Sequence, residues 1–280
     1  MKNKIILLTD YRGFFYSSHC SNYTTMNLKT IISEFSHYGF QAEILPIADL
    51  DLRKQNFSKI PVLYTSSEDT NLFYKDYLED MLWGLQLQGA WLIPDLQFFR
   101  AHHNKVFMEI LRDLSDLKEM QSIKSFGYGV FEDLTRSTPS FIPLVIKPSA
   151  GARSDGVVLA QNKNDILHYC KKISYSPNSY FSLAKTIIHR LKADHIDLLR
   201  RLKKVIENLE TCRSAVFNSY YRKKFIVQNY IPGVHFDYKV LIYGDKFYVL
   251  LRKNRPNDFR ASGSGLLSPP MQVPTELLEF

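Results

Sequence analysis

The amino-acid sequence predicts a mixed fold, α/β in its N-terminal part and α+β in the remainder. Up to about residue 98, short apolar segments alternate with segments of helical periodicity, which is typical of a parallel sheet with helical connections. Further along, pairs of apolar segments are separated only by short turns that contain glycine, which is typical of antiparallel hairpins. The chain has 280 residues, of which 45% are hydrophobic and 23% charged, so it can bury a sizeable core.

The first predicted domain covers residues 1–98. Its strands are expected at 4–9, 42–47, 61–65 and 89–94, and its helices at 24–38 and 71–87. Gly39 follows the first of these helices, and a glycine commonly ends a helix in this way. The fingerprint GxGxxG is absent after the first strand, so the sequence does not support a dinucleotide cofactor.

A hairpin that carries one lysine is the central feature of the second predicted domain, residues 99–224. An apolar strand delivers Lys147, a loop with Gly151 and Gly156 follows, and residues 157–160 form the return strand. Glycines leave backbone N–H groups accessible, so such a loop can fold over an anion to which Lys147 adds its charge. An ordinary hairpin with a solvated lysine has the same pattern, and both interpretations stay open at this point.

The other elements of the second domain are predicted from periodicity and turn residues. They are a helix that begins at Asn104-Lys105, a strand at 124–131, a helix at 164–172 capped by Asn164, and a helical insertion at 175–215. The insertion has apolar residues near one face and no chemistry of its own.

The third predicted domain, residues 225–280, begins with a buried strand at 225–233 that ends in a Pro-Gly turn. Two apolar strands then flank Gly244-Asp245, which is a strong hairpin signal. Asp237 and Lys239, on the first of these strands, point the same way because side chains alternate along a strand.

The segment after this hairpin is rich in groups that bind anions. Arg255 and Arg260 bracket a short stretch that ends in a Ser/Gly loop beginning at Ser262. A planar guanidinium can grip a phosphate or a carboxylate through two hydrogen bonds. Arg260 is therefore either an anion-binding group or a residue that only supports the turn.

The charge balance permits more than one kind of partner. The formal net charge is +8 with a pI near 9.2, and basic residues cluster at 200–204 and 222–224. A basic nucleic-acid-binding module is one function that suits this balance, and nucleotide phosphates or acidic substrates suit it equally. No RNP, KH or zinc pattern accompanies the clusters, so nucleic acid is the less favoured partner.

The cysteines and the apolar segments bear on the compartment. Cys20, Cys170 and Cys212 are far apart with no CxxC pair, which favours a reducing compartment and argues against a zinc site. No apolar run reaches the ~18–20 residues that span a bilayer, and the N-terminal aliphatic run is too short for a signal peptide. We expect a cytoplasmic protein with no membrane partner.

Taken in order, four segments resemble the ATP-grasp carboxylate–amine ligases, and most closely the branch that includes peptide–glutamate ligases and glutathione synthetases. The segments are Asn104-Lys105; 144–148 with the 151–156 loop; 225–233 with Asp237-Tyr-Lys239; and 259–265. The resemblance covers roughly residues 1–270. It implies a pre-ATP-grasp domain at 1–98, an N-terminal ATP-grasp lobe at 99–224, and an incomplete C-terminal lobe with antiparallel strands from 225.

The resemblance also implies an activity, in which ATP phosphorylates a carboxylate and an amine or thiol attacks the acylphosphate. The cofactors would be ATP and Mg²⁺, and the substrate a small carboxylate or a peptide with an amine acceptor.

Nucleotide-binding residues carried over from the family's motifs are Lys105, Lys147, Gly151, Ser154, Gly156, Gln228, Asn229, Tyr230, Ile231, Asp237 and Lys239. Arg252 is placed near the γ-phosphate, and Arg260 with Ser262 near the acylphosphate. The aromatic-rich loop 11–16 would line the carboxylate cleft or pack into a core. A homodimer is also implied, since family members commonly dimerise.

Three departures from the family pattern stand out. Gln228-Asn229 replaces an acidic residue of the hinge, and Lys239 replaces an arginine, which keeps the charge but loses the fork. The magnesium ligands of the family lie on strands beyond residue 280, so no metal ligand is expected within the chain and the chain as given is expected to be inactive. It is interpreted either as a fragment or as a non-catalytic ATP-grasp relative that acts as an interaction subunit.

Overall fold

The computed structural model describes residues 3–16, 25–66, 72–176 and 220–277. It divides into two compact units, Met1–His102 and His103–Phe280, here called unit 1 and unit 2. Apart from its first two residues, the insertion predicted at 175–215 lies outside the described residues, as do Cys20, Cys212 and the basic cluster 200–204. Within the described part of the chain, no helix is long and apolar enough to cross a membrane.

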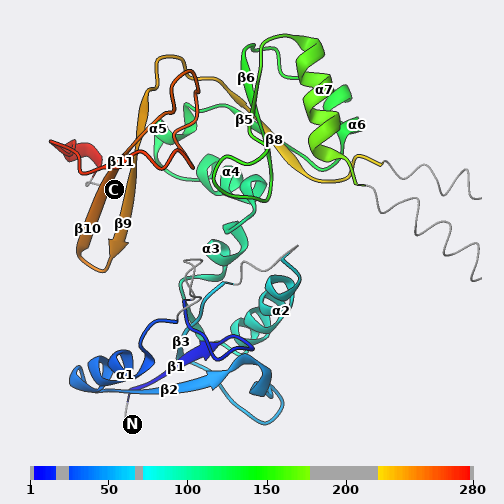
Figure 1. The fold of residues 1–280 in the computed structure, drawn as a ribbon. Helices are drawn as coiled ribbons and strands as arrows, with labels where there is room; N and C mark the ends of the chain where they lie inside the picture. The colour runs from blue at the N-terminus through cyan, green and yellow to red at the C-terminus, as the bar shows by residue number, and fades with distance from the viewer. Residues whose placement is uncertain (1–2, 17–24, 67–71, 177–219, 278–280) are drawn as a thin grey trace, which may run out of the picture. The chain divides into compact units, whose positions relative to one another are not determined.

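Unit 1 is built around a parallel sheet of four strands in the order β2-β1-β3-β4 (Figure 1). Its elements are β1 (Asn3–Thr9), α1 (Leu28–His37), β2 (Phe40–Pro46), the 3-10 turn η1 (Ile47–Asp49), β3 (Pro61–Leu63), α2 (Phe73–Leu87), β4 (Trp91–Ile93) and α3 (Leu96–Ala101). The N-terminal parallel α/β fold predicted from the sequence is confirmed.

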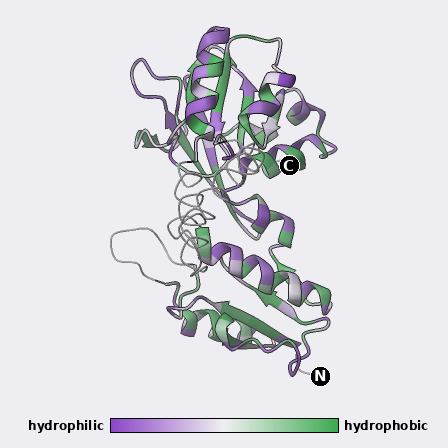
Figure 2. Cartoon of the chain, turned by 90° about the vertical axis from the view of Figure 1, so that its right-hand side faces the viewer, coloured by the Kyte–Doolittle hydropathy of each residue, from purple (hydrophilic) through white to green (hydrophobic). Residues whose placement is uncertain are grey.

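Helices cover both faces of this sheet. Ile6 and Leu8 of β1 pack in one core cluster with α2 and α3, whereas Ile5 and Leu7 pack in another with α1. A strand buried on both faces needs a continuous apolar run rather than alternation, which explains the Ile-Ile-Leu-Leu sequence of β1. Figure 2 shows these strands mainly in the hydrophobic colour.

Unit 2 contains two antiparallel sheets, in the orders β5-β8-β6-β7 and β11-β10-β9. Its elements are α4 (Lys105–Asp113), α5 (Lys118–Gln121), β5 (Ser125–Tyr128), α6 (Phe131–Arg136), β6 (Leu144–Pro148), β7 (Val158–Ala160), α7 (Lys163–Ser174), β8 (Phe225–Asn229), β9 (Phe236–Tyr243), β10 (Lys246–Lys253), β11 (Leu267–Ser268) and the 3-10 turn η3 (Thr275–Leu277). The predicted hairpins 144–160 and 237–252 are both confirmed, as is the mixed fold class.

The four-stranded sheet lies between α4 and the pair α6 and α7. Leu144, Ile146 and Val227 point toward α6 and α7, and they share a core cluster with residues of those helices. The alternate positions point toward α4. Val106 of α4 lies so close to Gly127 of β5 that a Cβ added to Gly127 would be 2.9 Å from the Cγ1 of Val106. The face toward α4 is the one that carries the side chain of Lys147, because Lys147 alternates with Ile146 along β6.

Several predicted boundaries differ from those of the structure. The N-cap of α7 is Asn162, not Asn164, and its side chain accepts a hydrogen bond from the N–H of Asp165. The strand predicted at 124–131 ends at Tyr128, and Phe131 begins α6 instead. The strand predicted at 225–233 ends at Asn229. Helices as short as α5 and α6 have too few residues to show a helical period, so the sequence did not reveal them.

Candidate functional site

The N-terminus of α4 is joined to the end of β6. The side-chain oxygen of Asn104 caps the helix by accepting a hydrogen bond from the N–H of Phe107 at 3.4 Å. The same oxygen accepts one from the hydroxyl of Ser149 at 3.2 Å, and the N–H of Lys105 donates to the carbonyl of Ser149 at 2.9 Å. The sequence thus places a capped helix start beside the point where β6 enters the glycine loop.

Lys105 and Lys147 come together at this junction. The ammonium of Lys105 donates to the carbonyl of Gly151 at 2.7 Å, and the ammonium of Lys147 donates to the amide oxygen of Gln228. Burial, and then the positive charge of Lys147, lower the pKa of Lys105. Burial also lowers the pKa of Lys147, whose side chain is only partly exposed. Among the described residues, neither ammonium forms an ion pair with a carboxylate.

A charged network on α4 lies near Lys147. Glu109 forms an ion pair with Arg112 and accepts a hydrogen bond from the hydroxyl of Ser125 at 2.5 Å. Arg112 donates to the same hydroxyl at 2.8 Å. The negative charge of Glu109 raises the pKa of Lys147, and the positive charge of Arg112 lowers it. This network was not predicted, although Glu109 and Arg112 lie three positions apart on a predicted helix.

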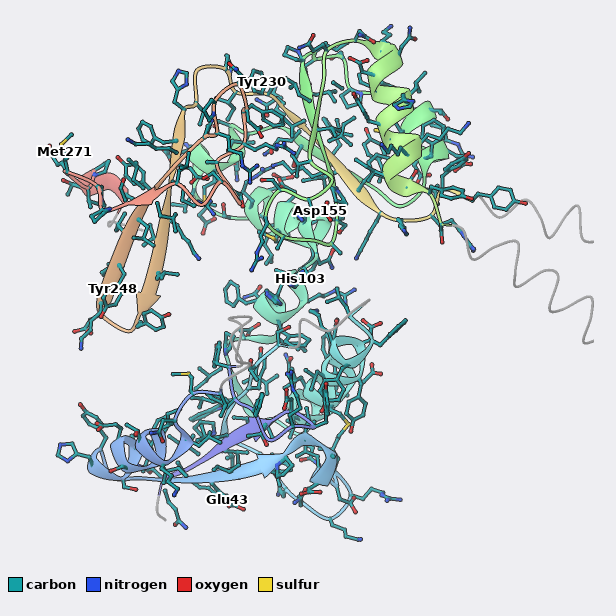
Figure 3. All side chains as sticks on the ribbon, in the orientation of Figure 1. Glu43, His103, Asp155, Tyr230, Tyr248 and Met271 are labelled. Carbon is teal, nitrogen blue, oxygen red and sulfur yellow. The ribbon has the colours of Figure 1, made fainter. Side chains whose placement is uncertain are left out.

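The glycine loop between β6 and β7 is fastened to a segment more than one hundred residues further along the chain. The hydroxyl of Ser154 donates to the carbonyl of Ser262 at 2.8 Å. Gly263 lies so close to the loop that a Cβ at its position would be 2.5 Å from the carbonyl oxygen of Arg153. The structure therefore brings together two segments that the sequence assigned separately to the phosphates and to the acyl group. Figure 3 labels Asp155 in this loop.

The two predicted catalytic arginines each hold a carboxylate. Arg260 forms a two-pronged pair with Asp258 and donates to the carbonyl of Val157 at 3.1 Å. These hydrogen bonds lower the pKa of Asp258 to about 2. Arg252 forms a similar pair with Asp237, at 2.7 and 2.8 Å, because β9 and β10 place the two residues directly opposite each other.

The remaining predicted nucleotide residues lie at the end of β8 and on β9. Gln228 points toward α4 with Lys147, whereas Asn229, the next residue, points to the opposite face, and its side-chain oxygen is buried without a hydrogen-bond partner in the described part of the chain. Tyr230, labelled in Figure 3, donates its N–H to the carbonyl of Pro143 at 3.2 Å. Lys239 is exposed on β9 opposite Leu250.

Two backbone groups lie just beyond the end of β8, at Tyr230 and Ile231. Over the described residues, neither the carbonyl of Tyr230 nor the N–H of Ile231 makes a backbone hydrogen bond. A backbone donor and acceptor need partners, which are water or a ligand at a surface position. Ile231 is itself 46% exposed.

The aromatic loop of unit 1 follows β1. Phe15 is buried in the core next to α1, whereas Tyr11 and Tyr16 are 64% and 52% exposed. Asp10, only 6% exposed, fixes the loop by accepting hydrogen bonds from the N–H groups of Arg12 and Phe14 at 2.8 and 3.0 Å. Part of the loop therefore packs into the core and part is available at the carboxyl end of the parallel sheet.

Comparisons with known proteins give no family assignment by sequence, since no family model and no curated protein match the chain. Solved structures with a similar arrangement include D-cycloserine synthetase DcsG, at 12% identity and TM-score 0.41, with 89% of this chain and 68% of that chain covered. ATP-grasp ligase PsnB in complex with a minimal precursor has 12% identity and TM-score 0.42, with 98% and 79% covered. D-alanine–D-alanine ligase from Bacillus anthracis has 13% identity and TM-score 0.34, with 99% and 74% covered. These values are too low to assign the chain to a family.

Proposed function

We propose that the chain is an ATP-dependent carboxylate–amine ligase of the ATP-grasp type, and that unit 2 binds the nucleotide on the α4 side of β6 and β8. The observation that carries the proposal is the meeting of Lys105 and Lys147. Two ammonium groups from different elements lie close enough to lower the pKa of Lys105, and both are bound to neutral oxygens. Such an arrangement lacks a negative charge that a polyphosphate would supply.

The chemistry of an adenine nucleotide fits the residues at both ends of this surface. The lysines would hold the phosphates through their charge, and the glycine loop would hold them through backbone N–H groups. At the other end, the carbonyl of Tyr230 can accept from the amino group of the base, and the N–H of Ile231 can donate to a ring nitrogen. Gln228 would then act on Lys147 rather than on the base, since its amide oxygen holds that ammonium.

In the proposed reaction the loop 151–156 closes over the phosphates and excludes water from them. Arg260 and Ser262 would orient the acyl group, since the loop and their segment are already joined by Ser154. Arg252 is proposed near the γ-phosphate, where its charge is partly offset by Asp237. The carboxylate and amine substrates, a homodimer and a cytoplasmic location remain proposals that rest on the sequence.

Magnesium would supply charge neutralisation to the phosphates in such a ligase. Among the described residues, no group of three or more His, Cys, Asp or Glu side chains is placed to hold a metal ion. Asp237 and Asp258, the carboxylates nearest the proposed catalytic arginines, are already held by them. The described side chains therefore do not form a metal site, and no step is assigned to the ion.

Calorimetric titration of the full chain with ATP and ADP, each with and without Mg²⁺, tests the nucleotide site. Lys147→Ala should lower affinity about 100-fold, because a partly buried charge-assisted hydrogen bond contributes roughly 2–3 kcal/mol. Lys163→Ala, which removes an exposed lysine at the start of α7, serves as the control of equal charge and should bind as the wild type does. Equal affinity of Lys147→Ala and wild type would contradict the proposal.

Ligase activity needs a second assay. Phosphate release from ATP is measured with mixtures of carboxylates and amines, and release that requires both would support a ligase. Nucleotide binding without such release would leave the non-catalytic interpretation. Oligonucleotide binding that falls steeply with salt, in a chain that binds no ATP, would instead favour the basic nucleic-acid-binding module.

A further inference from the structure

We infer that Lys224 is a third lysine of the nucleotide site and that it contacts the phosphate farthest from the base. The inference rests on the proposed function and deepens it, because it assigns a residue that the family motifs do not include. Lys224 immediately precedes β8 and its side chain is exposed.

The position of Lys224 is fixed from two sides. Its carbonyl accepts a hydrogen bond from the N–H of Ser149 at 3.1 Å, which ties the start of β8 to the entrance of the glycine loop. Its ammonium donates to the side-chain oxygen of Asn104 at 2.9 Å, across 120 residues of sequence. Asn104 is also the cap of α4 and the neighbour of Lys105. The ammonium of Lys224 is therefore held at the start of α4, next to the residue that follows Asn104, Lys105, and the helix dipole there favours an anion.

The direction of β8 sets the order of the contacts. Its far end leads to Tyr230 and Ile231, whose open backbone groups suit the base. Lys147 lies opposite Ile226 in the middle of the strand. Lys224 lies two residues before Ile226, roughly 7 Å further from the base at the usual rise of a strand. A nucleotide that runs along β8 from Tyr230 would thus reach Lys147 first and Lys224 last.

The electrostatics favour a ligand with several negative charges. The positive charge of Lys147 already lowers the pKa of Lys105, so the charges repel one another when no anion is present. Lys224 places a third ammonium near the same helix start. A polyphosphate has the length and the charge to contact cations that are spaced along β8, which a single phosphate group has not.

The test compares Lys224→Met with Lys223→Met in the full chain. Both variants lose one exposed positive charge from adjacent positions, so general electrostatic effects cancel. Each is titrated calorimetrically with ATP, ADP, AMP and inorganic tripolyphosphate, which carries the charges without the base. Far-UV circular dichroism during heating establishes that each variant is folded as the wild type is.

Lys224→Met should weaken ATP about tenfold, as expected for the loss of one charge-assisted contact, with a smaller effect on ADP and little on AMP. Lys223→Met should leave all affinities unchanged, and Lys224→Arg should keep most of the ATP affinity. A residue that only supports Asn104 would weaken the three nucleotides equally. That result, or equal behaviour of the Lys224 and Lys223 variants, would overturn the inference.

Tripolyphosphate separates failure of the inference from failure of the proposed function. If the wild type binds tripolyphosphate but no nucleotide, the nucleotide function fails, and the effect of Lys224→Met on tripolyphosphate still decides whether Lys224 belongs to the anion site. If the folded wild type binds neither, both proposals fail.

Discussion

Arg252 and Arg260 each lie in a two-pronged pair with a carboxylate of the same unit, whereas Lys105 and Lys147 hydrogen-bond to a carbonyl and to an amide oxygen. The charges of the arginines are thus compensated within the protein. Among the described residues, neither lysine has a carboxylate partner, and burial lowers the pKa of both lysines. The two arginines are thus already paired within unit 2, whereas the two lysines have the feature on which the proposed anion site rests.

The segment that carries Arg260 contacts the loop that follows Lys147 at Gly263. Gly263→Ala should lower the free energy of unfolding by about 2–4 kcal/mol, because a left-handed conformation is strained for alanine and the new Cβ would overlap the carbonyl of Arg153. Gly265→Ala is a matched control, since Gly265 has a similar φ of +73° with nothing within 4 Å of the added Cβ, and should cost only about 1 kcal/mol. Urea unfolding measures both.

The ATP affinity of the same two variants tests whether the segment around Gly263 holds the glycine loop in place. If the loop is held in place by the segment around Gly263, the Gly263 variant should also bind ATP more weakly than the Gly265 variant does. Equal losses of stability and affinity in the two variants would mean that the loop does not rest on this segment in solution.

Replacing one cation from each group with methionine should change stability in opposite directions. Arg252→Met leaves Asp237 without its partner and should lower the free energy of unfolding by about 1 kcal/mol, a modest value because the pair is partly exposed. Lys105→Met removes a half-buried charge that Lys147 repels, so stability should be unchanged or up to about 1 kcal/mol higher, while ADP affinity falls. Loss of stability in both variants would contradict the comparison.

The affinity for ADP should decrease with rising pH, and the decrease should begin at a lower pH than lysines with the ordinary pKa of 10.5 would cause. The free protein holds Lys105 and Lys147 with lowered pKa values, and a bound anion raises them, so binding takes up protons in that range. Affinity therefore decreases as pH rises through the lowered values. Titrations between pH 7 and 10, with Lys105→Met as the variant expected to flatten the profile, measure the effect.

At acid pH the affected contact should be the pair of Arg260 and Asp258, because Asp258 becomes protonated. The hydrogen bonds from Arg260 hold the pKa of Asp258 at about 2, below its ordinary value of 3.8. A lowered carboxyl pKa stabilises the folded state above the ordinary value, and this stabilisation is lost as pH falls from about 4 toward 2. Asp258→Asn should reduce the acid-induced drop in melting temperature slightly, whereas Asp245→Asn, at an exposed turn, should not. An equal acid-induced drop in melting temperature in wild type and Asp258→Asn would contradict a stabilising role of the pair of Arg260 and Asp258.

Much of the fold could be predicted because its signals are local. The apolar run of β1, the capped start of α4 at Asn104 and the turn at Gly244-Asp245 each depend on a few consecutive residues. One prediction failed where neighbouring residues offered the same chemistry. Asn162 and Asn164 are both good caps, and in the structure Asn162 accepts the capping hydrogen bond.

For the candidate site, the sequence predicted which residues take part more than which contacts they make. Lys147 and Arg260 were recognised as candidates because cationic groups beside glycine-rich turns suit anions, and Lys105 was added by the family resemblance. The contacts of Ser125 with Glu109 and of Lys224 with Asn104 were missed, since each joins residues of different elements.

The sequence by itself determined most of the strands, the longer helices of the described residues, the two hairpins and the concentration of lysine, arginine and glycine in the second half of the chain. These follow from side-chain periodicity and from the conformations that glycine and capping residues allow within a few positions. Only the tertiary structure decided that Lys147 meets Gln228 across 81 residues and that Ser154 meets Ser262 across 108. The reason is that strand register and sheet packing, set by the burial of apolar side chains throughout unit 2, determine which distant polar groups come within hydrogen-bonding distance.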